Sequence, residues 1–228
     1  MALTTIGLMA LLGCFTGFMA GLLGIGGGMI ITPFLIMLIP SSLIPHEHIV
    51  HVAIATSLAT IAFTSLSSVR AHHKRGAVLW NVVASVAPGI LVGAVVGAQI
   101  AGWLPTFWLS LIFAAFVGFS AFKMFLNKSP RPDRNLPGTI GKFFMGIAIG
   151  ILSALVGAGG GFISVPWMIW CNVKMQNAVA TSAAFGFPIA LFGTIGYIIS
   201  GWNVSGLPPW PIDLGYICIP ALFSVAIT

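Results

Sequence analysis

The sequence predicts an all-α integral membrane protein built from two inverted repeats, and three observations support this fold class. The 228-residue chain is 58% hydrophobic and only 5% charged, whereas soluble domains carry about 25% charged residues. Its apolar runs are continuous and do not alternate with polar residues, which favours membrane-spanning helices over a β-barrel. A glycine-rich motif also occurs twice, once in each half of the chain, and each copy interrupts an apolar run.

The two copies of the glycine motif correspond residue by residue. The first copy, Leu22 to Phe34, contains Gly24, three consecutive glycines and Pro33, and the copy from Leu155 to Trp167 repeats them 133 residues later. Three consecutive glycines disfavour a helix because their unfolded backbone entropy is high. Each copy therefore predicts a helix that breaks and restarts, with the glycines at the restart.

The first repeat, residues 1–126, is expected to contain a full helix, a short helix and three further helices. The full helix covers Thr4 to Leu23 and is long enough to span a bilayer, whereas the short piece from Met29 to Ile39 is not. The three later spans are Ile49 to Val69, Val78 to Ile100 and Thr106 to Leu126. The residues leave open whether the short piece crosses the membrane or re-enters and returns.

Two features mark the ends and faces of these spans. The basic stretch Arg70 to Gly76 is expected to close the span that begins at Ile49. Gly89, Gly93 and Gly97 recur at every fourth residue of the next span, which predicts close packing against another helix.

Residues 127–138 form a polar, proline-containing linker, and residues 139–228 repeat the same order of segments. A span from Thr139 to Val156 precedes a short piece from Phe162 to Trp170. Val179 to Ser182 then matches Ile54 to Ser57, and Pro220 matches Pro88. Because the first repeat continues well beyond Pro88, the second repeat is expected to be truncated here, with the native chain continuing past Thr228.

The charges of equivalent loops predict that the repeats have opposite orientations. Arg70 to Arg75 is basic, whereas its counterpart Ser200 to Asp213 contains no Lys or Arg. Cys171 to Gln176 carries Lys174, whereas its counterpart Pro40 to His48 has no Lys or Arg. Cytoplasmic loops of membrane proteins are enriched in basic residues. We therefore expect inverted repeats in the cytoplasmic (inner) membrane, with Arg70 to Arg75 inside and the N-terminus outside.

The glycine breaks are the first candidate binding site. A restarting helix presents unpaired N–H groups and the positive end of its dipole, which together favour an anion. The predicted binding residues are Gly26, Gly27, Gly28, Gly159, Gly160 and Gly161. Close packing is the alternative reason for glycine, but packing alone requires neither three glycines in a row nor a proline five residues later.

Hydroxyl and aromatic side chains complete the predicted site. Thr56 and Ser57 occupy the same places in the first repeat as Thr181 and Ser182 in the second, and are expected to donate hydrogen bonds to the anion. The alternative is that these hydroxyls bond the carbonyl groups of their own helix. Trp167 follows the second motif proline and is expected to form a wall of the site, although tryptophan is also common at membrane interfaces.

Other classes of function are disfavoured. His46, Glu47, His48 and His51 lack the HExxH spacing of a metalloprotease, so we expect no metal, no other cofactor and no catalytic residue. The net charge of +6 comes largely from short basic loops, so no nucleic-acid partner is expected. An anion channel remains an alternative to a carrier, and an intramembrane enzyme is a weaker one. The oligomeric state stays open, with a homodimer as one alternative.

These motifs resemble one known family. The two glycine motifs with their prolines, the segment Ala55 to Ser57 and the basic stretch Arg70 to Gly76 are similar to the TauE/SafE sulfite exporter family, also called toluene sulfonate uptake permeases. The resemblance covers nearly the whole chain. It implies membrane transport of sulfur-containing anions such as sulfite, sulfoacetate or aryl sulfonates, as the small-molecule partner. It fixes neither the substrate nor the direction of transport.

Overall fold

A computed structural model describes residues 28–39, 44–126, 135–202 and 213–226, together with positions 7, 11, 13–18, 204 and 207. Side-chain surroundings are described for these residues except 123–126 and 213. The predicted first span, Thr4 to Leu23, therefore lies largely outside the described residues, and so do Gly26 and Gly27.

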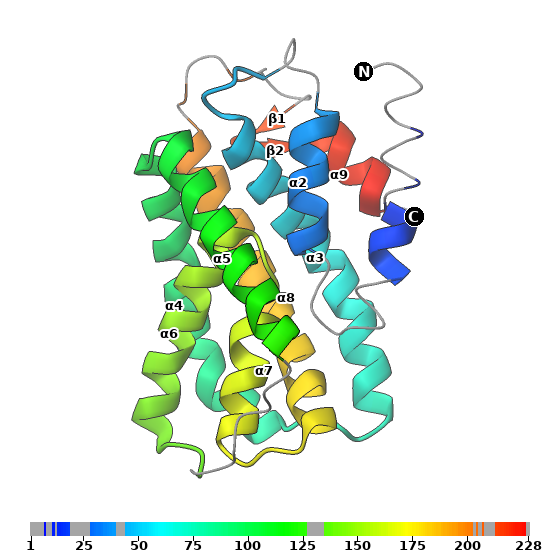
Figure 1. The fold of residues 1–228 in the computed structure, drawn as a ribbon, viewed down its shortest axis with the longest axis vertical. Helices are drawn as coiled ribbons and strands as arrows, with labels where there is room; N and C mark the ends of the chain where they lie inside the picture. Colours follow the sequence, from blue (N-terminus) through cyan, green and yellow to red (C-terminus); the bar gives the residue numbers. More distant parts are fainter. Residues whose placement is uncertain are drawn as a thin grey trace.

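The described part of the chain is almost entirely helical, which confirms the predicted all-α membrane fold (Figure 1). Its helices are α2 (Gly28–Leu38), α3 (Ile49–Lys74), α4 (Trp80–Trp103), α5 (Thr106–Leu126), α6 (Thr139–Val156), α7 (Gly161–Trp170), α8 (Met175–Gly201) and α9 (Ile219–Ala226). Two short antiparallel strands, β1 (Asp213–Leu214) and β2 (Ile217–Cys218), join α8 to α9. The sequence did not predict this hairpin, whose turn places Gly215 at a φ of +61°.

Most helix boundaries agree with the predictions. The bounds of α5 and α6 are those expected, and α2 and α7 each begin at the third glycine of their motif, Gly28 and Gly161. The prediction that a helix ends at Val69 is wrong, because α3 continues to Lys74. Its basic residues tolerate helical geometry, and the chain turns only at Gly76, where φ is +64°.

Among the described residues, the helices α3, α4, α6 and α8 are long and apolar enough to cross a membrane. Many large apolar side chains on their outer faces stay exposed, as the surface of a protein in a lipid bilayer requires. Exposed examples are Phe63, Val92, Val96, Phe144, Leu191 and Ile199.

Helices α4 and α6 pack through the predicted glycine face. A Cβ atom placed on Gly89 would lie 2.0 Å from the carbonyl oxygen of Phe143, and one on Gly93 would lie 2.3 Å from that of Ile147. Gly146 on α6 approaches the backbone of α4 as closely, since its Cβ would lie 2.3 Å from the carbonyl oxygen of Val86. This confirms the packing role expected for the glycines of α4.

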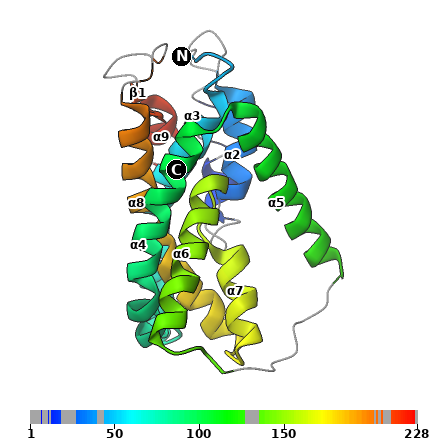
Figure 2. The ribbon, with the colours of Figure 1, turned by 90° about the vertical axis from the view of Figure 1, so that its left-hand side faces the viewer.

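The equivalent long helices α3 and α8 run in opposite directions. Figure 1 shows α3 descending and α8 ascending, and a hydrogen bond from the backbone N–H of Cys218, after α8, to Thr56 near the start of α3 agrees. In Figures 1 and 2, α7 returns towards the end of the molecule at which α6 begins. Helix α2 runs from the middle of the molecule to the opposite end.

The end of the molecule opposite the basic residues is held by His51. The His51 Nε2 atom lies 3.0 Å from the carbonyl oxygens of Ala101, in the last turn of α4, and of Leu104, its C-cap, so Nε2–H donates to both. The His51 ring also stacks on Tyr216 of the hairpin, with ring centroids 5.1 Å apart. Burial raises the pKa of the Tyr216 hydroxyl above its usual range. This cluster joins α3, the α4–α5 turn and the hairpin.

Candidate functional site

The break between α6 and α7 is built by glycines in a left-handed conformation. Gly157, which ends α6, has a φ of +67°, and Gly160, which precedes α7, has a φ of +77°. The N–H groups of Gly157 and Ala158 both donate to the carbonyl oxygen of Ser153 and so close the last turn of α6. Residues other than glycine adopt this left-handed backbone conformation only with strain. The positions of the glycines therefore determine where the helix breaks.

The start of α7 is buried and has no side-chain cap. Gly157 to Gly161 are all buried, and the N-cap residue Gly160 has no side chain that could accept a bond from the first turn. The N–H groups of Gly161 and Phe162 have no partner within the helix, because the first turn of any α-helix lacks acceptors. Unpaired donors and a positive dipole end thus lie away from water, where their attraction for an anion is strongest.

The start of α2 meets this break directly. A Cβ atom on Gly28 would lie 2.1 Å from the carbonyl oxygen of Gly157 and 2.5 Å from Cδ1 of Ile61. The structure therefore brings the third glycine of the first motif against the break of the second, which are far apart in sequence. Gly28 is required here by close backbone approach.

Two hydroxyl pairs connect the short helices to the long helices that follow them. In the first half, Thr32 Oγ1 lies 3.0 Å from Ser57 Oγ. In the second half, Ser164 Oγ lies 2.8 Å from Ser182 Oγ. All four residues are buried. Sequence reasoning predicted Ser57 and Ser182 but missed their partners, Thr32 and Ser164.

A local signal could have found the missed partners. Thr32 lies four residues after Gly28 and its Oγ1 is 2.9 Å from the Gly28 carbonyl oxygen. Ser164 lies four residues after Gly160 and its Oγ is 2.9 Å from the Gly160 carbonyl oxygen. A hydroxyl one helical turn after the last glycines is placed on the same face as the break.

The hydroxyl groups of Thr56 and Thr181 accept hydrogen bonds from the other half of the chain. The Thr56 hydroxyl accepts the N–H of Cys218, directly before α9, at 3.0 Å. The Thr181 hydroxyl accepts the N–H of Leu79, directly before α4, at 3.0 Å. Both threonines thus help to hold the start of the next helix in the other half. Their role as substrate donors stays a prediction.

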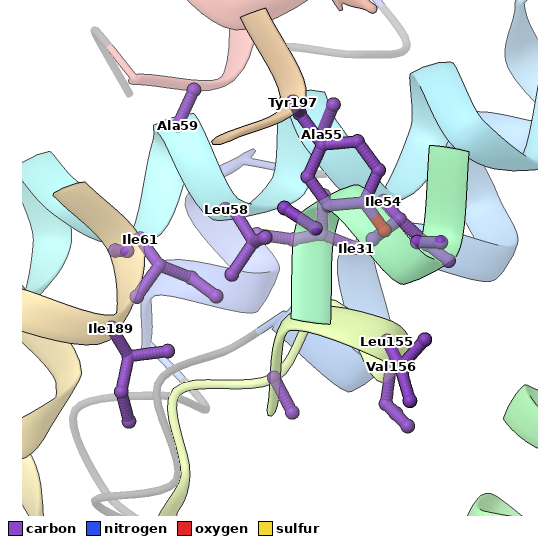
Figure 3. Packing of buried hydrophobic residues seen from close by; sticks show 14 of the residues in the cluster. Ile31, Ile54, Ala55, Leu58, Ala59, Ile61, Leu155, Val156, Ile189 and Tyr197 are labelled. Carbon is purple, nitrogen blue, oxygen red and sulfur yellow. The ribbon is translucent and has the colours of Figure 1, made fainter. Parts of the chain in front are cut away.

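Apolar side chains surround the break, and the described residues contribute no charge to it. Figure 3 shows part of this buried layer, to which Ile54, Leu58 and Ile61 of α3 and Leu155 and Val156 of α6 belong. Charged residues of the described helices lie near helix ends: Arg70, Lys74, Lys123 and Lys142. An anion at the break would therefore be held by backbone and hydroxyl groups rather than by a counter-charge.

The remaining residues of the predicted site are Gly26, Gly27, Gly159 and Trp167. Gly26 and Gly27 lie outside the described residues, and Gly159 lies within the buried break. Trp167 is half-buried on α7, two turns from the break, and packs against the buried core. Its role as a wall of the site stays a prediction.

Known proteins resemble this chain over almost its full length. The profile described as "Sulfite exporter TauE/SafE" matches residues 9–228. A probable membrane transporter protein of Haemophilus influenzae is 34% identical over 226 residues, which cover 99% of this chain and 85% of that protein. The probable membrane transporter protein YdhB of Bacillus subtilis is 30% identical over 194 residues, covering 82% of this chain and 76% of YdhB. No solved structure matches the chain.

Proposed function

Because this chain belongs to the sulfite exporter TauE/SafE family of membrane transporters, we propose that it carries sulfur-containing anions such as sulfite, sulfoacetate or organosulfonates. The single observation that supports this best is the meeting of the two glycine motifs, in which the start of α2 abuts the break before α7. Two helix N-termini then approach one place from opposite ends of the molecule. Broken helices of this kind bind anionic groups in transporters built from inverted repeats.

The expected strength of such a site suits a carrier. One helix N-terminus favours an anion by roughly 0.3–1 kcal/mol when exposed and up to about 2 kcal/mol when partly buried. Two termini with direct N–H bonds support micromolar to millimolar binding, which is weak enough to allow release. A buried counter-charge would instead be costly in a bilayer, and no charged side chain of the described residues lies mid-helix.

The distribution of basic residues gives the proposed orientation. Arg70 and Lys74 at the end of α3, Lys142 at the start of α6, and Lys174 before α8 all lie at the lower end of the molecule in Figure 1. By the positive-inside rule, we propose that this end faces the cytoplasm and that the protein lies in the cytoplasmic (inner) membrane. An inside-negative potential then drives anions outward by about 2.3 kcal/mol per charge per 100 mV, so export needs no coupling ion.

The orientation is testable by labelling single cysteines with a membrane-impermeant reagent, in a background with Cys14, Cys171 and Cys218 replaced by serine. Glu47→Cys, exposed at one end, should react in intact cells. Ala77→Cys, in the turn after α3 at the other end, should react only after the membrane is opened. The reverse pattern would overturn the proposed orientation.

Transport is tested in proteoliposomes with sulfite, sulfate, sulfoacetate, taurine and an aryl sulfonate. We expect saturable uptake of at least one sulfur anion, accelerated by an inside-positive potential. The control variant Gly118→Ala should transport as wild type does, because there is open space around the Cβ position of Gly118. Flux that rises without saturation would favour a channel of the same architecture. Uptake no faster than in protein-free liposomes, for every anion, would refute the proposal.

A further inference from the structure

Ser153 is a buried hydroxyl with no hydrogen-bond partner. It lies in the last turn of α6 and is only 1% exposed. Among the described residues, the buried side-chain atoms without a partner are His48 Nδ1, Ser153 Oγ, Thr194 Oγ1 and Ser200 Oγ. Of these residues, Ser153 alone is fully buried, whereas the others are partly exposed. Leaving a buried hydroxyl unpaired destabilises a fold, so its presence calls for an explanation.

The hydroxyl of Ser153 lies at the start of α7. A Cβ atom placed on Gly160, the N-cap residue of α7, would lie 3.3 Å from Ser153 Oγ. The carbonyl oxygen of Ser153 accepts the N–H groups of Gly157 and Ala158, which ties this residue to the break. The unpaired hydroxyl and the unpaired N–H groups of the helix start therefore lie together.

The usual structural use of a helical serine does not apply to Ser153. Serine and threonine in apolar helices commonly bond a carbonyl one turn earlier, as Thr60 does to Thr56 and Ser164 does to Gly160. Ser153 makes no such bond. The first glycine motif has Ala20 at the equivalent position, so the repeated motif does not itself require a hydroxyl there.

We propose that the Ser153 hydroxyl donates a hydrogen bond to an oxygen of the transported sulfur oxyanion, next to the N–H groups at the start of α7. This inference rests on the proposed function. It makes the binding site asymmetric, because the second repeat then holds the charged oxygens of the anion. Cδ1 of Ile189, seen on α8 in Figure 3, would lie 2.5 Å from a Cβ on Gly160. As the end of a flexible side chain, this methyl group is the part that turns aside when the anion enters.

The test is anion binding by detergent-purified protein, measured by calorimetry with sulfite and with sulfoacetate as probes. Ser153→Ala should bind about tenfold more weakly or worse, because a hydrogen bond to a charged group is lost. Ser153→Thr, which keeps the hydroxyl, should retain most of the affinity. Ser200→Ala is the matched control, since it removes another unpaired hydroxyl, which lies beside Gly102 near the end of α4, and should leave affinity unchanged.

A second readout separates binding from a structural role. Without anion, the thermal midpoint of Ser153→Ala should equal or exceed that of wild type, because the substitution removes an unsatisfied group. Wild-type affinity in Ser153→Ala, or a Ser153→Ala protein that unfolds or melts lower without anion, overturns the inference and leaves the proposed function standing. If wild type itself binds neither anion here and transports none of the panel above, the proposed function fails and this inference fails with it.

Discussion

The short helices α2 and α7 begin with the same glycine motif but meet different surroundings. At the first, the Cβ position of Gly28 lies 2.1 Å from a backbone oxygen, which cannot move aside. At the second, the Cβ position of Gly160 lies 2.5 Å from the terminal methyl of Ile189, which can. The two glycines are not equivalent positions of the motif, since Gly28 matches Gly161 at the 133-residue offset. The start of α2 is thus fixed by a rigid backbone contact, whereas the residue before α7 lies beside a flexible side chain.

The serines that follow the short helices differ in the same sense. Ser57 Oγ lies 3.0 Å from Thr32 Oγ1, 3.0 Å from the carbonyl oxygen of Ile54 and 3.2 Å from that of Gly157. Ser182 Oγ has one partner among the described residues, Ser164. The Ser57 hydroxyl therefore has all its hydrogen-bonding capacity occupied within the protein, whereas the Ser182 hydroxyl can still form a further hydrogen bond. Equal sequence thus does not give equal availability for a ligand.

The largest effect is expected from Gly28→Ala. The added methyl group must push apart two backbone segments, so we expect a loss of about 3 kcal/mol or more and little monodisperse protein. Thermal unfolding and size-exclusion chromatography in detergent measure this. The control Gly118→Ala, in an exposed part of α5, should be neutral or slightly stabilising. Normal behaviour of Gly28→Ala would show that the two motifs do not pack as described.

A smaller loss is expected for Gly160→Ala. The left-handed backbone at Gly160 costs a side chain roughly 1–2 kcal/mol, and Ile189 adds little because its end can turn away. The thermal midpoint should therefore fall less than for Gly28→Ala. The opposite order would remove the distinction between a rigid contact at α2 and a flexible one at α7.

The two serines should differ moderately. Ser57→Ala removes the hydroxyl that bonds the carbonyl oxygen of Gly157 as well as Thr32, although Thr32 keeps its bond to Gly28, and should cost about 1–3 kcal/mol. Ser182→Ala should cost about 0.5–1.5 kcal/mol, because Ser164 keeps its bond to Gly160. Chemical denaturation of both variants in the same detergent measures the difference. Equal losses would argue that both hydroxyls are equally committed to the fold.

The smallest difference is expected between Thr56→Val and Thr181→Val. Each removes one bond between the halves, to Cys218 or to Leu79, and both bonds are 3.0 Å long. Each variant should lose about 1 kcal/mol of stability, and the two midpoints should agree. Clearly unequal midpoints would show that the two halves do not support each other symmetrically.

Much of the helical framework could be predicted because it depends on local properties. Apolar length determined α5 and α6, and the third glycine of each motif determined where α2 and α7 begin. The end of α3 was misjudged because a change from apolar to basic residues marks the membrane surface but does not stop a helix. The structural stop is the left-handed Gly76.

The sequence by itself determined the membrane class, the order of the described segments and the glycine break before α7, since hydropathy and backbone entropy act over neighbouring residues. Only the tertiary structure decided that Gly28 meets Gly157, that Thr32 and Ser164 pair with the predicted serines, and that Ser153 remains unpaired. Those outcomes depend on which helices pack together and at what rotation. A shift of one residue along a helix turns a side chain by about 100°, given 3.6 residues per turn, so a repeated motif alone cannot specify its partners.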